Sequence, residues 1–186
     1  MDPWLSAALA TVSSEESTQH FLEASISSCG FVVARPSDFE HELTHSCGLM
    51  ALRRLGTVQG LLESMGPEEV RREAECVVAV LPNAGAALAV ALGLAGYQEA
   101  QPVAIACGSG NVLRGPGGEL HGATIQAVRR LCGWARPHEL LIPRPVLERT
   151  RVPEGVGVYD GPEVLEKELG FSVAILRDFR VAVPLN

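Results

Sequence analysis

The stretch of residues 120–143, LHGATIQAVRRLCGWARPHELLIP, constrains the fold more than any other part of this chain. Gly122 interrupts the segment before it, and apolar residues then recur at helical spacing. These residues are Ile125, Val128, Leu131 and Cys132. Pro137 ends the pattern, and residues 140–142 form a short apolar run typical of a central strand. The stretch therefore predicts a glycine turn, an amphipathic helix, a proline loop and a buried strand.

The chain before this stretch contains the same two kinds of segment. Short, nearly uninterrupted apolar runs predict buried strands. They lie at residues 31–34, 76–81 and 103–107. Apolar residues at helical spacing predict helix over residues 39–65, and Asn83 is a suitable N-cap for an Ala/Leu helix that ends near Leu94. The glycine-rich residues 108–122 lack the lysine and Ser/Thr of a phosphate-binding loop, so they predict a hairpin.

Composition and charge narrow the classes of protein to which the chain can belong. With 186 residues, of which 47% are hydrophobic, the chain can build one globular domain with a small appendage. The longest apolar run, residues 77–94, is interrupted by Pro82, Asn83 and Gly85, so no membrane span is expected. A net charge of −7 argues against a nucleic-acid or anionic-membrane partner. The paired arginines at 53–54, 71–72 and 129–130 are expected on solvated helix faces.

The five cysteines are scattered and include no CxxC pair. They are Cys29, Cys47, Cys76, Cys107 and Cys132. An odd number of cysteines, mostly in apolar surroundings, is typical of small core residues in a reducing compartment. The first residues show neither the basic start nor the long apolar core of a signal peptide, so we expect a cytoplasmic protein.

Residues 1–29 differ from the remainder, and we predict an N-terminal helical arm there and an α/β domain over residues 30–186. Ser13 followed by Glu16 matches a capping box for a helix that carries Phe21 and Leu22. Such an arm packs on its own domain or on a partner. A scaffold protein that binds through this arm is therefore one alternative function.

The order of motifs resembles the class III nucleotidyl cyclases, the adenylate and guanylate cyclase homology domains. GATIQAVRR and RPHELLIP are similar to that family's G-x-x-V-N-x-A-x-R helix and the P-G-E-I-L-V strand after it. ECVVAVLPNAGAALAVALGL resembles its G-D-x-x-x-A-V-F-P strand and Ala-rich helix, and PEGVGVYDGPEVLEKELGFSVAILRDF resembles its closing strand pair. The resemblance covers about residues 30–179 and implies a mixed sheet of ferredoxin-like topology with helices mainly on one face.

The resemblance also assigns roles to individual positions. Aligning VVARPSDF with the family's F-x-D-I-x-G-F-T places Arg35 where an aspartate would hold catalytic metal. Glu75 occupies the place of the second metal-binding aspartate. A fixed cation cannot bind Mg²⁺, so the resemblance implies a disabled metal site in which Glu75 is a weak remaining ligand.

The anion-binding half of the family's site is partly retained. Gln126 takes the place of the ribose-orienting asparagine, and Arg130 that of the phosphate-neutralising arginine. By the same resemblance, Glu119 falls at the acidic position that reads the base, and Arg71 falls near the base-reading lysine. Cyclisation needs two metal ions held by carboxylates, so we expect no catalysis and no cofactor beyond Mg²⁺ carried with a nucleotide.

The function that the resemblance implies is therefore that of a catalytically inactive, pseudoenzyme module of bacterial signalling. Such a module would act as a homodimer, or as a heterodimer with a cyclase-like partner. Because cyclase sites form between two chains, it could supply Gln126 and Arg130 to that partner, and the resemblance also implies nucleotide binding.

The segment HELTH favours a different class of protein. On a helix, His41 and His45 would lie one turn apart and could share Zn²⁺, with Glu42 as the base that deprotonates bound water. Gly48 extends the motif toward the metzincin form, but Ala51 stands where the third histidine would be. A zinc-dependent hydrolase or peptidase is therefore the second alternative, and a solvated helix start also explains the pattern.

Overall fold

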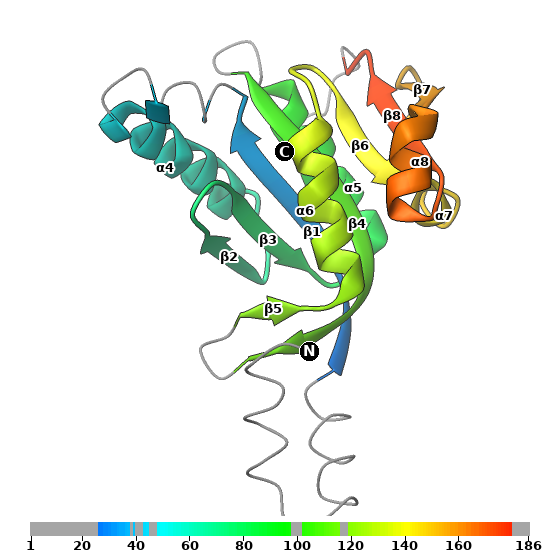
Figure 1. The fold of residues 1–186 in the computed structure, drawn as a ribbon, viewed down its shortest axis with the longest axis horizontal. Helices are drawn as coiled ribbons and strands as arrows, with labels where there is room; N and C mark the ends of the chain where they lie inside the picture. The colour runs from blue at the N-terminus through cyan, green and yellow to red at the C-terminus, as the bar shows by residue number, and fades with distance from the viewer. Residues whose placement is uncertain are drawn as a thin grey trace, which may run out of the picture.

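The computed structural model describes residues 26–37, 39, 43–44, 48–97, 102–115 and 119–179. Its strands are β1 (Ile26–Pro36), β2 (Glu69–Arg72), β3 (Val77–Leu81), β4 (Val103–Arg114), β5 (Leu120–His121), β6 (Leu140–Pro143), β7 (Gly157–Asp160) and β8 (Val173–Arg177). Its helices are α4 (Gly48–Ser64), α5 (Ala84–Gly96), α6 (Ala123–Trp134), α7 (Arg144–Leu147) and α8 (Glu163–Leu169). The strands form one sheet in the order β2-β3-β1-β4-β6-β8-β7, with β5 paired to β4 (Figure 1).

The first half of the sheet has the ferredoxin-like topology that the sequence predicts. The succession β1-α4-β2-β3-α5-β4 produces the spatial order β2-β3-β1-β4, in which every neighbouring pair is antiparallel. Helix α6 then carries the chain to β6, which runs parallel to β4. The pairs β6–β8 and β7–β8 are antiparallel. The result is a mixed sheet, as expected.

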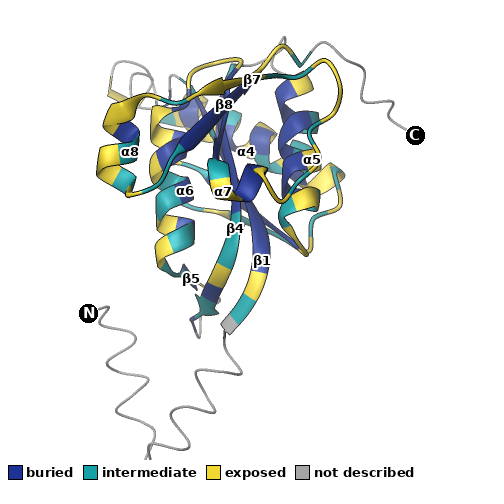
Figure 2. Cartoon of the chain, turned by 90° about the vertical axis from the view of Figure 1, so that its right-hand side faces the viewer, coloured by how far each residue is buried: buried dark blue, intermediate teal, exposed yellow. Residues whose placement is uncertain are grey.

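Helices cover both faces of this sheet. Val32 and Ala34 of β1 pack in one core with α4 and α5, whereas Phe31 and Val33 pack in a second core with α6. Successive residues of a strand point to opposite faces of the sheet. Because both faces are covered, all four side chains are fully buried. The expectation of helices mainly on one face was wrong, since α6 and α8 cover the face opposite to α4, α5 and α7 (Figure 2).

Helix α6 is built as the sequence predicts. Gly122 precedes it with φ of 146°, a backbone conformation that favours glycine. Its buried residues are Ile125, Val128, Leu131 and Cys132. The helix lies very close to β4, because a Cβ atom on Gly108 would stand 2.5 Å from Cγ2 of Val128. Absence of a side chain at Gly108 therefore fixes how α6 sits on the sheet.

Several elements are longer than their sequence patterns, or follow no apolar pattern. β1 begins at Ile26, so it includes four residues that the sequence analysis assigned to the arm. β4 continues to Arg114, and the predicted hairpin is the turn from β4 into β5. β2 is a charged edge strand that the sequence analysis missed. Residues 1–25, which hold the predicted arm, lie outside the described residues, so the arm stays a prediction.

Among the described residues, no helix combines the length and the apolar character that crossing a bilayer requires.

Gly30 provides a test of the packing of α5 against β1. A Cβ atom at this position would stand 2.2 Å from the backbone oxygen of Asn83, the N-cap residue of α5. A backbone atom cannot move out of the way as the end of a side chain can. Because of this clash, we expect Gly30→Ala to lower the free energy of unfolding by about 3 kcal/mol. Gly60→Ala on α4 is the matched control, because nothing lies within 4 Å of its added Cβ. It should raise the free energy by about 0.5–1 kcal/mol. Equal effects in urea denaturation would contradict this packing.

Candidate functional site

The structure places Arg35 and Glu75 in one pocket of about 300 Å³, here called the β1 pocket. Its walls come from the end of β1, the turn before β3 and the last turns of α6. The lining residues are Val33, Arg35, Glu73, Ala74, Glu75, Cys76, Arg129, Cys132 and Gly133. The two positions that the resemblance assigns to metal binding are thus neighbours in space, although 40 residues separate them in the sequence.

Arg35 has a structural contact in this pocket. Its Nη2 donates a hydrogen bond of 3.1 Å to the backbone oxygen of Gly133. Gly133 belongs to the last turn of α6, where carbonyl groups have no partner within the helix and carry the negative end of the helix dipole. The guanidinium therefore caps the C-terminus of α6 and joins it to β1.

An ion pair closes the pocket between α6 and the β2–β3 turn. Arg129 Nε donates to Oε2 of Glu73 at 2.9 Å, and Nη2 of the same guanidinium contacts Oε1. Both side chains are shielded, with 21% and 30% of their surface exposed. Arg129 was expected on a solvated helix face, and that expectation was wrong. A bidentate pair of this kind fixes the geometry of both partners.

The residues of the β1 pocket do not fit a two-metal site. Such a site needs several carboxylate oxygens facing one point. Both oxygens of Glu73 already bind Arg129, and Glu75 is exposed. Arg35 and Arg129 bring two positive charges that would repel a divalent cation. Within the described ranges, no group of three or more His, Cys, Asp or Glu residues could hold a metal ion.

The two thiols that line the pocket are neutral, which makes them poor nucleophiles. Burial, together with the nearby Glu73 carboxylate, raises the pKa of Cys76 to about 12, and its Sγ lies 3.6 Å from Glu73 Oε2. Burial raises the pKa of Cys132 as well, and its Sγ contacts the backbone oxygen of Ala104 at 3.4 Å. Because the thiolate is the nucleophilic form, both residues react slowly with electrophiles at neutral pH.

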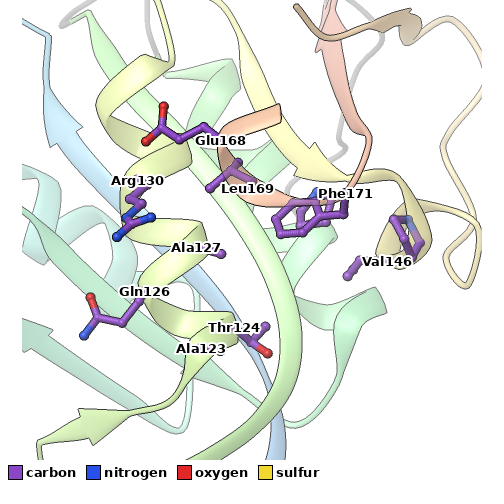
Figure 3. Close-up of a pocket in the computed structure, with 11 residues that line it drawn as sticks. Ala123, Thr124, Gln126, Ala127, Arg130, Val146, Glu168, Leu169 and Phe171 are labelled. Carbon is purple, nitrogen blue, oxygen red and sulfur yellow. The ribbon is translucent and has the colours of Figure 1, made fainter. Parts of the chain in front are cut away.

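Gln126 and Arg130 line a separate cavity of about 580 Å³, here called the α6–α8 groove. Its remaining lining residues are Ala123, Thr124, Ala127, Pro143, Pro145, Val146, Glu168, Leu169 and Phe171. Both polar side chains are exposed, and Figure 3 shows them on α6, on the side away from Phe171. One protomer therefore holds the two halves of the predicted site in different cavities.

The predicted base-reading residues lie at neither cavity. Arg71 forms an ion pair with Glu69, which also binds Arg114 of β4. Burial alone would raise the pKa of Glu69, but its hydrogen bonds and attraction to Arg114 and Arg71 outweigh burial and lower that pKa. Glu119 is exposed at the β4–β5 turn, where its Oε2 would meet a Cβ placed on Gly115 at 2.6 Å. Arg71 thus has a partner on its own strand.

The predicted zinc ligands lie outside the described residues. His41, Glu42 and His45 belong to this undescribed part, and of the HELTH segment the structure describes Leu43 and Thr44. The zinc hypothesis therefore stays a prediction from sequence.

Comparisons with known proteins identify the fold. Neither a family model nor a curated protein matches the sequence. Among solved structures, the guanylyl cyclase Cya2 matches with a TM-score of 0.63 at 14% identity, covering 87% of this chain and 96% of that one. An adenylate/guanylate cyclase/hydrolase from Silicibacter pomeroyi gives 0.63 at 18% identity, covering 84% and 99%. The guanylate cyclase domain of RhGC from Catenaria anguillulae gives 0.63 at 15%, covering 81% and 95%.

These likenesses establish the class of fold. The chain adopts the mixed α/β fold of class III adenylate and guanylate cyclase domains, as the sequence motifs predict. At 11–18% identity the likeness concerns the fold alone, and the chemistry of the site has to be argued from its own residues.

Adjacent arginines of α6 offer a test of the Glu73 contact. Arg129→Met removes a shielded bidentate partner and leaves the Glu73 carboxylate unpaired, so the free energy of unfolding should fall by about 1–3 kcal/mol. Arg130→Met is the matched control, because Arg130 is exposed, and it should change that free energy by less than about 0.5 kcal/mol. Urea denaturation measures both variants. The same loss in both would contradict a specific role for Arg129.

Cys76 provides a second test through its pKa. A thiol whose pKa is about 12 in the folded state and 9.0 when unfolded stabilises the fold fully below pH 9. That contribution is lost as the pH rises from 9 toward 12, because the unfolded thiol ionises first. We expect the thiolate fraction of native Cys76 at pH 8 to be about 1000-fold below that of a free cysteine. Iodoacetamide labelling followed by mass spectrometry measures this, and rapid native labelling would contradict it.

Proposed function

We propose that this chain is a non-catalytic cyclase-homology module that acts by associating with a second cyclase-like domain, either another copy of itself or a different chain. One observation carries the proposal. The guanidinium of Arg35 lies in the β1 pocket and donates a hydrogen bond to the end of α6. By the family resemblance, residue 35 would be a metal-binding carboxylate.

The energetic consequence of this replacement is large. Two metal ions stabilise the charge that develops on the transferring phosphates, and losing a ligand that holds them removes several kcal/mol. Each 1.4 kcal/mol or so is a tenfold change in rate. Glu75 alone, beside two guanidinium groups, does not replace the lost site. Turnover by this chain alone would therefore be negligible.

Association is supported by how the two halves of the site are arranged. Gln126 and Arg130 are exposed on α6, and the β1 pocket lies near the end of the same helix. Since cyclase sites form between two chains, α6 of one protomer would face the β1 pocket of the other, with Arg130 opposite Glu75. A role in signalling, and nucleotide binding at Gln126 and Arg130, follow as parts of the same proposal.

The catalytic part of the proposal has a direct test. Purified protein should convert neither ATP nor GTP to the cyclic product above background with Mg²⁺ or Mn²⁺, because its residues hold no metal pair. Arg130→Ala should give the same background as the unsubstituted chain. Turnover that Arg130→Ala abolishes, and that the control Arg53→Ala on α4 retains, would refute the proposal.

The association part is tested by exchanging charges. We expect sedimentation equilibrium to show self-association of the chain and Arg130→Glu to weaken it about tenfold, because two acidic groups would then face each other. Mixing Arg130→Glu with Glu75→Arg restores opposite charges at both contacts and should restore the affinity. Association that ignores both substitutions would mean that the protomers meet through another surface.

A further inference from the structure

The two end strands of the sheet differ in how far they are protected against pairing with another strand. The order β2-β3-β1-β4-β6-β8-β7 ends at β2 and at β7 (Figure 1). β2 has the sequence EVRR, and charged side chains are a common means of blocking association between sheet edges. β7 has the sequence GVYD, in which the only charge is at the end, and its last three residues are exposed (Figure 2). β7 is therefore the edge that is open to a partner.

The backbone groups that β7 turns outward follow from its register with β8. The N–H of Gly161, directly after the strand, donates a hydrogen bond of 2.8 Å to the oxygen of Val173. In an antiparallel ladder, residues that bond to the neighbouring strand alternate with residues that point away from it. Tyr159 therefore bonds to β8, whereas the N–H and C=O groups of Val158 and Asp160 point to the open side. No other described segment hydrogen-bonds to these backbone groups.

These outward groups are complementary to those of a second copy of the same strand. If two β7 strands run antiparallel around a two-fold axis at Tyr159, Val158 of each copy lies opposite Asp160 of the other. Each such pair exchanges two hydrogen bonds, so the contact forms about four. Each Asp160 carboxylate then lies beside a valine, and no like charges are directly opposite each other. The register thus fits a second copy of this chain.

The side chain of Tyr159 also suits the two-fold axis. It is 46% exposed, and its hydroxyl donates to Asp178 Oδ2 at 3.1 Å. The Arg177 guanidinium lies 5.4 Å from the ring centroid, so the ring is held in place by its own chain. Opposite residues that exchange no hydrogen bonds have Cα atoms about 4.5 Å apart. The tyrosine rings of two copies would therefore lie side by side and bury aromatic surface that one protomer exposes.

We propose that β7 of one chain pairs antiparallel with β7 of a second copy and joins the two sheets into one. Tyr159 of each copy lies at the two-fold axis, and Val158 faces Asp160 of the partner subunit. In the sheet order, β4, β6 and β8 separate β7 from β1, so the pair leaves the β1 pocket and α6 of both chains open. The inference therefore goes beyond the proposed function and does not rest on it.

Disulfide trapping in the full chain tests the pairing. Tyr159→Cys places the thiols of two copies across the axis at a Cα separation of about 4.5 Å, which a disulfide can span. Oxidised glutathione is the oxidant. One thiolate displaces reduced glutathione from it and forms a mixed disulfide, and the thiolate of the second copy then displaces the other glutathione. Covalent dimers, two chains of 19.7 kDa each, should therefore form rapidly.

The matched control for the trapping is Arg72→Cys, which places an exposed thiol on the charged edge strand β2. The unsubstituted chain, with its own five cysteines, gives the background. We expect covalent dimers to form at least about tenfold faster from Tyr159→Cys than from Arg72→Cys, because a paired edge holds the two thiols together at high effective concentration.

Two substitutions of the exposed Val158 test the register in the Tyr159→Cys chain. Val158→Glu places a carboxylate opposite Asp160 of the partner subunit at both contacts, whereas Val158→Lys places an ammonium group there. Because like charges directly opposite each other destabilise a strand pair and opposite charges stabilise it, dimers should form roughly fivefold more slowly with glutamate than with lysine. Both variants keep every backbone group, so the fold of one chain is expected to be unchanged.

Three results would overturn the inference. They are an absence of covalent dimers from Tyr159→Cys, equal rates from positions 159 and 72, and equal rates from Val158→Glu and Val158→Lys. The trapping is repeated with Arg130→Glu, which disrupts the association in the proposed function, and the rate from Tyr159→Cys should not change. The failure of this inference is therefore distinguishable from the failure of the proposed function.

Discussion

The contact between the Arg35 guanidinium and the last turn of α6 is the constraint on which the rest of the site depends. It joins the central strand β1 to a helix that is remote in sequence, and it satisfies a carbonyl group that the helix itself leaves without a partner. Together with the Glu73–Arg129 pair, it anchors one side of α6 to the sheet. The side of the helix away from its buried residues faces outward, with Gln126 and Arg130 exposed.

The same contact changes the electrostatics of the β1 pocket. A pocket of carboxylates attracts divalent cations because its charges are unbalanced. Here the positive charges of Arg35 and Arg129 balance the negative charges of Glu73 and Glu75. The pocket therefore has no net charge that a cation would neutralise. The thiols of the half-buried Cys76 and the buried Cys132 are neutral and add no charge. The chain thus has the fold of nucleotidyl cyclase domains, and its β1 pocket contains as many guanidinium groups as carboxylates.

Sequence reasoning predicted the elements whose signal is local. Helix α6 follows from the apolar spacing around Val128, and the Asn83 cap follows from its place before an Ala/Leu run, where its side chain accepts from the Ala86 N–H. β2 was missed because a charged edge strand has no apolar pattern. The Glu73–Arg129 pair could not be predicted, because its partners lie 56 residues apart and depend on how α6 crosses the sheet. The resemblance assigns Arg35 and Glu75 to one site, and both residues line the β1 pocket, while their roles stay predictions.

Titration of Mn²⁺ into the protein, followed by electron paramagnetic resonance of the free ion, tests the central claim most directly. If the guanidinium of Arg35 has replaced a metal ligand, the signal of free Mn²⁺ should equal that of buffer at every ratio of ion to protein. Stoichiometric loss of that signal, reversed by Glu75→Gln and unaffected by Glu63→Gln on α4, would show a working metal site and contradict the account.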